Sequence, residues 1–140
     1  MDRPALETLT RQWISLWCAP VDWRLFNRLH GETFEDYSAV GRASDKKGFA
    51  LGLTEVITAF PDLQRWIEDL VIDEQRSRVA VRWVAEGIQQ ASFLGQDPTH
   101  QRTVFTGIEI LEVAGGQITG RWGDWDFPTT VPVPQPGHID

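Results

Sequence analysis

The chain has 140 residues, of which 41% are hydrophobic and 24% are charged, and its formal net charge is −7. This size and composition predict one globular domain, and the acidic balance excludes a general nucleic-acid binder, which needs a basic surface. The N-terminus lacks the pattern of a signal peptide, and no stretch approaches the roughly 18 uninterrupted apolar residues of a membrane helix, so we expect a cytoplasmic protein without membrane contact.

The first thirty residues predict two helices. Apolar residues recur at three- and four-residue spacing after Pro4, which predicts an amphipathic helix that ends near Ala19-Pro20. A second, shorter helix is predicted from Val21 to His30. Asp22 is its expected N-cap, and Gly31 is expected to end it.

A short strand and a third helix are expected next. The strand is predicted from Thr33 to Val40. Asp45 or Ser44 can cap the helix, which is predicted to run to Ala59 because Pro61 cannot continue it.

After this helix the apolar pattern changes to that of extended strands. Four runs follow, of which the middle two are joined by a longer loop and the others by tight turns: Leu63 to Asp73, Arg78 to Gln90, Gln101 to Ala114 and Gln117 to Phe127. Consecutive strands with short links form an antiparallel sheet, and helices followed by strands predict an α+β fold with the helices on one face. We expect a single domain over residues 1–127, followed by a proline-rich C-terminal tail over residues 128–140.

The last two strands are predicted to form a hairpin through Gly115-Gly116, because a type I′ turn needs positive φ at both central residues. This loop pairs Ala114 with Gln117 and Glu109 with Trp122. One face then carries Phe105, Glu109, Leu111, Val113, Ile118, Trp122, Asp124 and Asp126. The other face carries Thr106, Ile108, Ile110, Arg121 and Trp125. A single bulge between Gly116 and Asp126 would exchange the later assignments.

Both faces of this hairpin carry apolar residues. A sheet exposed on one side is normally polar there, so the face with Ile108, Ile110 and Trp125 predicts a homodimer through the outer sheet surface. On the inner side, Trp83 of the preceding strand is expected to meet Trp122 and Asp126. An aromatic pocket that contains a carboxylate is typical of a small-molecule site.

Several short segments occur in a familiar order along the chain. They are Ala59-Phe60-Pro61-Asp62-Leu63, Arg78-Val79-Ala80-Val81-Arg82-Trp83, Gly95, Asp97-Pro98-Thr99, Gly107-Ile108, Gly116-Gln117-Ile118, Trp122 and Asp126. Together they resemble the SnoaL-like polyketide cyclase (ester cyclase) family of the nuclear transport factor two-like superfamily, over roughly residues 5–127. The resemblance implies a cone-shaped, cystatin-like α+β barrel, in which a curved antiparallel sheet wraps around N-terminal helices and a central pocket. It also implies a dimer.

The resemblance further implies that an aspartate near the end of the last strand is the general acid/base of an aldol closure, without a metal or other cofactor. Asp126 occupies the matching position. A carboxylate in an apolar pocket has its charged form disfavoured, which suits proton transfer near neutral pH. The family's histidine after the second long strand is absent here, since the residues are Gly87-Ile88-Gln89, so a second proton-transfer group must come from elsewhere.

Glu109 is the alternative catalytic partner if it points inward. Trp83, Trp122, Phe105, His30 and Asp124 are expected to line the substrate pocket. The three histidines are scattered without metal-ligand spacing, so we expect no metal site. The first hypothesis is therefore a cofactor-independent cyclase acting on a hydrophobic small molecule. The alternatives are a non-catalytic ligand-binding or dimerisation module on the same fold, and a dehydratase or isomerase.

Overall fold

Three helices and five strands make up the computed structural model, which describes residues 1–127. The predicted proline-rich tail lies outside the described residues. The helices are α1 (Arg3–Ser15), α2 (Trp23–Leu29) and α3 (Lys46–Ala59). The strands are β1 (His30–Asp36), β2 (Gln64–Asp73), β3 (Arg78–Ile88), β4 (Arg102–Ala114) and β5 (Gln117–Asp126).

Each helix begins at an aspartate. The side chains of Asp2, Asp22 and Asp45 accept hydrogen bonds from backbone N–H groups three residues further on, at 3.0, 3.0 and 2.8 Å. A carboxylate at this position satisfies a free N–H group of the first turn and interacts favourably with the helix dipole. The predicted N-caps Asp22 and Asp45 are therefore confirmed.

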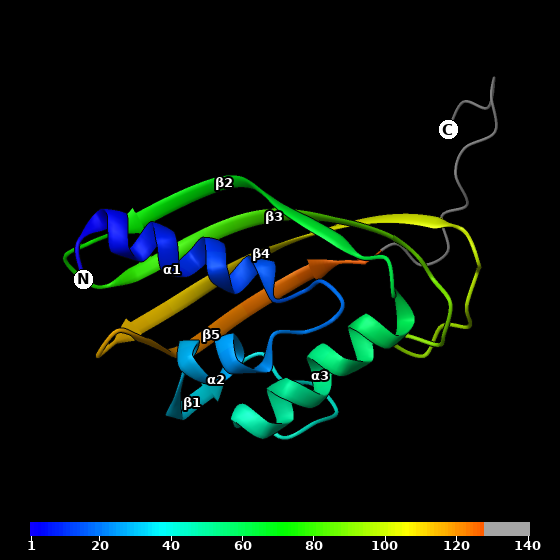
Figure 1. Cartoon of the computed structure of the whole chain (residues 1–140), viewed down its shortest axis with the longest axis horizontal. Helices are drawn as coiled ribbons and strands as arrows, with labels where there is room; N and C mark the ends of the chain where they lie inside the picture. The colour runs from blue at the N-terminus through cyan, green and yellow to red at the C-terminus, as the bar shows by residue number, and fades with distance from the viewer. Residues whose placement is uncertain (128–140) are drawn as a thin grey trace.

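The strands form one curved sheet in the order β1-β5-β4-β3-β2, which is not closed into a barrel. Strands β2 to β5 are antiparallel, as predicted, whereas β1 runs parallel to β5. Figure 1 shows α1 crossing the concave face of the sheet and α3 lying below the far end of β5. The predicted α+β class, with N-terminal helices covering one face of a curved sheet, is confirmed.

The first strand differs from the prediction in its position. We expected His30 to end a helix and the strand to begin at Thr33, but β1 begins at His30 and ends at Asp36. The prediction that Gly31 ends the helix is also wrong, because α2 ends at Leu29 with His30 as its C-cap, and Gly31 is already part of β1. Residue 30 thereby moves from the end of a helix to the first position of a strand, and its side chain is fully buried in the core.

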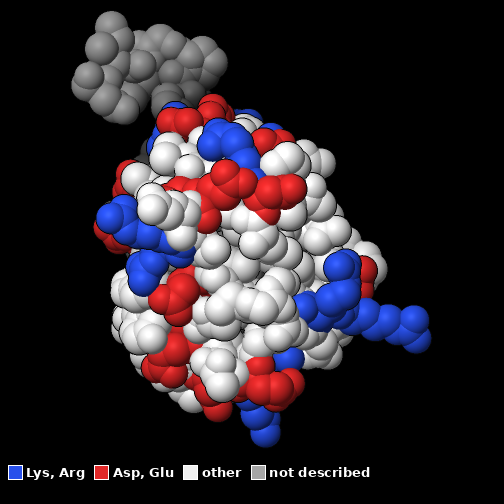
Figure 2. All heavy atoms as spheres, turned by 90° about the vertical axis from the view of Figure 1, so that its left-hand side faces the viewer, with Lys and Arg blue, Asp and Glu red and all other residues white. Residues whose placement is uncertain are grey.

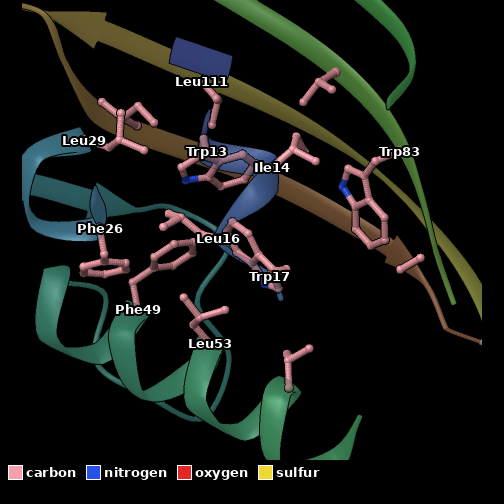
Figure 3. Packing of buried hydrophobic residues seen from close by; sticks show 14 of the residues in the cluster. Trp13, Ile14, Leu16, Trp17, Phe26, Leu29, Phe49, Leu53, Trp83 and Leu111 are labelled. Atoms are coloured by element: carbon pink, nitrogen blue, oxygen red, sulfur yellow. The ribbon is translucent and has the colours of Figure 1, made fainter. Parts of the chain in front are cut away.

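The core consists of apolar side chains from the helices and from the inner face of the sheet. Figure 3 shows Trp13 and Trp17, at and just after the end of α1, facing Phe49 and Leu53 of α3. The rings of Trp13 and Trp17 lie 4.6 Å apart in an edge-to-face arrangement. The alternating row Val79, Val81, Trp83, Ala85 and Gly87 of β3 is buried, as its pattern predicted.

The predicted register of the β4–β5 hairpin is wrong beyond its first pairs. Ala114 pairs with Gln117 and Val113 with Ile118, as expected, but the register then shifts by one residue at Thr119. Glu109 consequently faces Gly123 instead of Trp122. Because neighbouring residues of a strand point to opposite faces, this one bulge moves every later side chain of β5 to the other side of the sheet.

The surface carries charges of both signs. Figure 2 shows Lys and Arg side chains interspersed with Asp and Glu side chains over the face that it displays. None of the helices formed by residues 1–127 combines the length and the apolar character needed to traverse a bilayer.

Candidate functional site

A cavity of about 280 Å³ lies between α3 and the end of β5. We call it the α3–β5 cavity. Its apolar wall is formed by Trp17, Phe49, Leu53, Val56, Phe93 and Trp125. Its polar lining includes Ser38, Arg42, Glu55, Arg121 and Asp124. An apolar, aromatic wall with a few polar groups is the usual composition of a small-molecule pocket.

The polar side of this cavity is built on three buried charges. Arg121 of β5 donates to both carboxylate oxygens of Glu109, from Nε at 2.9 Å and from Nη2 at 3.0 Å. Its Nη1 donates to Oδ1 of Asp36 at 3.0 Å. Strands β1, β5 and β4 are adjacent in the sheet, so the three side chains meet on its inner face.

Two further arginines extend this cluster. Arg42, in the segment between β1 and α3, donates from Nη2 to Oδ2 of Asp36 at 2.7 Å. Arg65, at the start of β2, lies with Nη2 at 3.5 Å from Oε1 of Glu109. Positive and negative groups therefore alternate in the order Arg42–Asp36–Arg121–Glu109–Arg65, which we call the ion-pair chain.

The guanidinium group of Arg65 lies among indole rings. Its central carbon is 4.1 Å from the ring centre of Trp17 and 3.9 Å from that of Trp83. The ring of Trp125 is 5.8 Å away. The faces of indole rings attract cations, which compensates part of the hydration that Arg65 loses. Trp17 and Trp125 also line the α3–β5 cavity, so Arg65 lies directly behind the cavity wall.

Several donors of this cluster lack an acceptor. Arg42 Nη1, Arg65 Nε, Arg65 Nη1 and Trp83 Nε1 are buried and have no hydrogen-bond partner among the described residues. Glu109, in contrast, also accepts a hydrogen bond from Trp125 Nε1 at 2.7 Å. The acceptors of the ion-pair chain are thus fully used, whereas donors at both of its ends are not.

The pKa values of two of these arginines are shifted in opposite directions, although burial acts to lower both. Loss of hydration lowers the pKa of Arg65 to about 9, with attraction by Glu109 opposing this effect and repulsion by Arg121 adding to it. Burial also acts to lower the pKa of Arg121, but attraction and hydrogen bonds from Glu109 and Asp36 outweigh it and raise that pKa above its ordinary value. Both groups are charged at neutral pH.

Two strand glycines make room for this arrangement. A Cβ atom at Gly123 would lie within 1.9 Å of Glu109 Oε2 and 2.3 Å of Arg121 Nη2. A Cβ atom at Gly107 would lie 2.3 Å from the ring of Trp83. A glycine inside a strand often marks a close approach of this kind. Both glycines are therefore required by the side chains of the site.

The structure changes the positions of the two candidate aspartates. Asp126 is exposed and pairs across the hairpin with Thr106 on the outer face, so its expected position inside the pocket is wrong. The bulge at Thr119 is the cause. Asp124 is also exposed and pairs with Ile108, so its side chain was moved to the outer face as well, although the residue still forms part of the mouth of the α3–β5 cavity. A catalytic role for either residue stays a prediction.

Glu109 points inward and is fully buried, as one alternative of the sequence analysis required. Trp83 and Phe105 face the interior and are buried, but they pack in the core and do not line the α3–β5 cavity. Trp122 was expected inside, yet it lies on the outer face and stacks on Tyr37 at 4.5 Å. Trp125 was expected outside, yet it lines the cavity.

His30 is in the core, away from the cavity. Its Nδ1 hydrogen-bonds to the carbonyl oxygen of Phe26 at 2.8 Å, and its Nε2 accepts from Trp13 Nε1 at 3.1 Å. Both ring nitrogens are therefore occupied by structural partners. Burial lowers the pKa of His30 to about 4, so the ring is neutral at neutral pH.

Sequence reasoning missed Arg121, Asp36, Arg42 and Arg65 as members of the site. One signal was present in the sequence, because Gly107 and Gly123 each interrupt a strand pattern. In the correct register Gly123 lies opposite Glu109, so the missing side chain at Gly123 leaves the space that the Glu109 carboxylate occupies. Within residues 1–127, no three His, Cys, Asp or Glu side chains are grouped so that they could hold a metal ion.

Comparisons with known proteins agree with this architecture. The profile of the SnoaL-like polyketide cyclase family matches residues 7–131. TsrD from Streptomyces laurentii is similar in structure, with a TM-score of 0.80, 17% sequence identity, and coverage of 90% of this chain and 91% of TsrD.

Two further solved structures are similar to the chain. AclR from Streptomyces galilaeus, proposed to be a hydroxylase, has a TM-score of 0.76 at 21% identity, with coverage of 90% of this chain and 81% of AclR. IdmH from Streptomyces antibioticus, proposed to be a polyketide cyclase, has a TM-score of 0.73 at 19% identity, with coverage of 86% of this chain and 91% of IdmH. No curated protein sequence matches the chain significantly. From the family match over most of its length, we conclude that the chain belongs to the SnoaL-like polyketide cyclase family.

Proposed function

We propose that this protein binds an apolar small molecule in the α3–β5 cavity. The observation that carries the proposal is the cavity itself, whose apolar wall includes the indoles of Trp17 and Trp125 and whose polar side includes Arg121. Apolar rings gain free energy by leaving water for such a wall, and the few polar groups orient the ligand.

Naphthamide, an uncharged bicyclic amide, is a suitable probe. We expect it to quench tryptophan fluorescence saturably, because Trp17 and Trp125 line the cavity. Trp125→Phe should reduce the amplitude of this change. Trp122→Phe, the matched control on the outer face, should leave it unaltered. A linear, unsaturable response, or an equal effect of the two substitutions, would refute binding in this cavity.

Cyclisation is the second candidate function. Membership of the polyketide cyclase family supports it, and so does the position of Asp124 at the cavity mouth. Among residues 1–127, Glu55 and Asp124 are the carboxylic side chains that line the cavity. Either can exchange a proton with a bound carbonyl compound.

Turnover of a β-diketone that closes by aldol condensation tests this candidate. Asp124→Asn should then lower kcat by about a hundredfold or more, the ordinary contribution of a general acid or base. If catalysis persists in Asp124→Asn and in Glu55→Gln, neither carboxyl group transfers the proton.

A homodimer through the outer sheet face is part of the proposal. Ile108 and Ile110 are 53% and 41% exposed on the outer side of β4, and Trp66 and Val104 lie exposed on the same side of the sheet. A second copy of the chain would remove these side chains from water. Sedimentation should then give twice the chain mass, and Ile108→Glu should reduce it to that of one chain. A wild-type protein that sediments as a monomer would refute this arrangement.

A further inference from the structure

The ion-pair chain carries more positive than negative charge. It contains the guanidinium groups of Arg42, Arg121 and Arg65 but only the carboxylates of Asp36 and Glu109. His30 adds no charge at neutral pH, because its ring is neutral there. One positive charge is therefore not balanced by these buried partners.

This excess charge lies at the ends of the ion-pair chain. The central Arg121 is held by two carboxylates, whereas Arg42 forms an ion pair only with Asp36, and Arg65 forms one only with Glu109, at 3.5 Å. The buried donors without a partner, Arg42 Nη1 together with Nε and Nη1 of Arg65, belong to these same two arginines. Charge and hydrogen-bonding capacity are thus both left over at the same places.

Such an arrangement lowers the stability of the folded protein. A buried donor without an acceptor loses its hydration without compensation, and the loss is larger for a charged group. Replacement of a buried ionic group by an apolar side chain of similar volume often stabilises a protein. Groups that reduce stability in this way are common at binding sites, where the ligand supplies the missing partner.

We propose that the α3–β5 cavity selects apolar ligands that carry one negative charge, such as a carboxylate or an ionised phenol or enol, and that Arg42 holds this group. This inference rests on the proposed function, since it specifies the class of ligand for the same cavity. Arg42 is the end of the ion-pair chain that lines the cavity. Arg65 lies behind Trp17 and Trp125 and adds attraction through that wall.

The two carboxylates at the mouth do not oppose this assignment strongly. Glu55 and Asp124 line the cavity but are exposed to solvent. Water and salt screen exposed charges, whereas the guanidinium groups of the ion-pair chain are mostly or fully removed from water. Arg42 and Arg65 have side chains that are only 20% and 2% exposed. Attraction within the cavity therefore outweighs repulsion at its mouth.

A matched ligand pair tests the inference. Naphthoate and naphthamide have the same shape, but only naphthoate is charged. We expect the full chain to bind naphthoate at least about tenfold more tightly, since a charge-assisted hydrogen bond is worth that factor. Equal affinities would overturn the inference while leaving the proposed function intact. Failure of both ligands to bind would overturn both.

Substitutions of single arginines then identify which positive charge causes the preference for naphthoate over naphthamide. Arg42→Met should reduce the naphthoate-to-naphthamide affinity ratio to near one, and Arg42→Lys should restore most of it. Arg65→Met should reduce the ratio by a smaller factor and raise the midpoint of urea unfolding. Arg82→Met, the same change on an exposed arginine of the outer face, should leave the ratio unchanged. The ratio does not depend on the folded fraction, because both ligands need the folded protein. An unchanged ratio in Arg42→Met would overturn the assignment of this residue.

Discussion

Two buried polar centres share the interior of this protein and differ in how completely their hydrogen bonds are satisfied. At His30, one ring nitrogen hydrogen-bonds to a backbone carbonyl and the other accepts from an indole, and the ring is neutral at neutral pH. In the ion-pair chain, five charged side chains meet, and buried donors remain without acceptors. Phe49 lies between the centres, since its ring is near both His30 and the guanidinium groups of Arg42 and Arg121.

This difference separates a structural role from a binding role. A polar group whose donors and acceptors are all used fixes the packing around it and has nothing left for a ligand. His30 is such a group, because both of its ring nitrogens already have hydrogen-bond partners. The ion-pair chain keeps unused donors next to a cavity, so it can still bind an acceptor. Whether all the hydrogen bonds of a buried polar group are satisfied therefore distinguishes a structural role from a binding role better than the type of residue does.

The largest predicted effect follows from removal of one carboxylate of the ion-pair chain. Glu109→Gln keeps the shape of the side chain but leaves Arg121 and Arg65 without their shared counter-ion. We expect the free energy of unfolding to fall by about 3–5 kcal/mol, the usual consequence of breaking a buried ion pair. Urea denaturation at neutral pH measures this change.

Glu112→Gln is the matched control on the same strand. Glu112 pairs with Arg78, but the two side chains are 35% and 43% exposed. Because solvent screens such a pair, its loss should lower the free energy of unfolding by less than about 1 kcal/mol. Similar losses in the two variants would contradict the picture of a buried, tightly coupled ionic centre.

The second prediction concerns the pH dependence that His30 confers. Its pKa is about 4 in the folded protein and 6.5 when unperturbed, so the unfolded chain binds more protons between these values. Stability should therefore fall as the pH is lowered from 6.5 to 4, by about 3 kcal/mol in total, and no further contribution arises below pH 4. Urea unfolding of the wild type across this range measures the loss.

Comparison with His30→Gln isolates this contribution. The variant cannot take up a proton in this range, so its stability should fall by about 3 kcal/mol less than that of the wild type between pH 7 and pH 4. His100→Gln, at an exposed position, should follow the wild-type curve. Parallel curves for the wild type and His30→Gln would show that the histidine is not held neutral in the core.

The sequence predicted the fold more fully than the site. Apolar periodicity identified the three helices, aspartate caps supported two of them, and the glycine pair Gly115-Gly116 identified the hairpin. These signals are local. The site depends on the one-residue bulge at Thr119, which is a property of the paired strands, and on the parallel pairing of β1 with β5, which brings Asp36 to Arg121. Neither has a distinctive local pattern, so Trp122 and Trp125 were assigned to the wrong faces.

The smallest predicted effect tests this corrected register. Asp126 is exposed on the outer face, so Asp126→Asn should change the free energy of unfolding by less than about 0.5 kcal/mol and leave naphthamide affinity unaltered. Asp124→Asn, the same change two residues earlier, alters the cavity mouth and should raise naphthoate affinity by about twofold, since it removes a screened negative charge. Titration of both variants with the two ligands measures these effects. A large loss of naphthamide binding in Asp126→Asn, with none in Asp124→Asn, would mean that β5 presents Asp126 to the ligand, and the assignment of the cavity to the Arg121 and Trp125 face would be wrong.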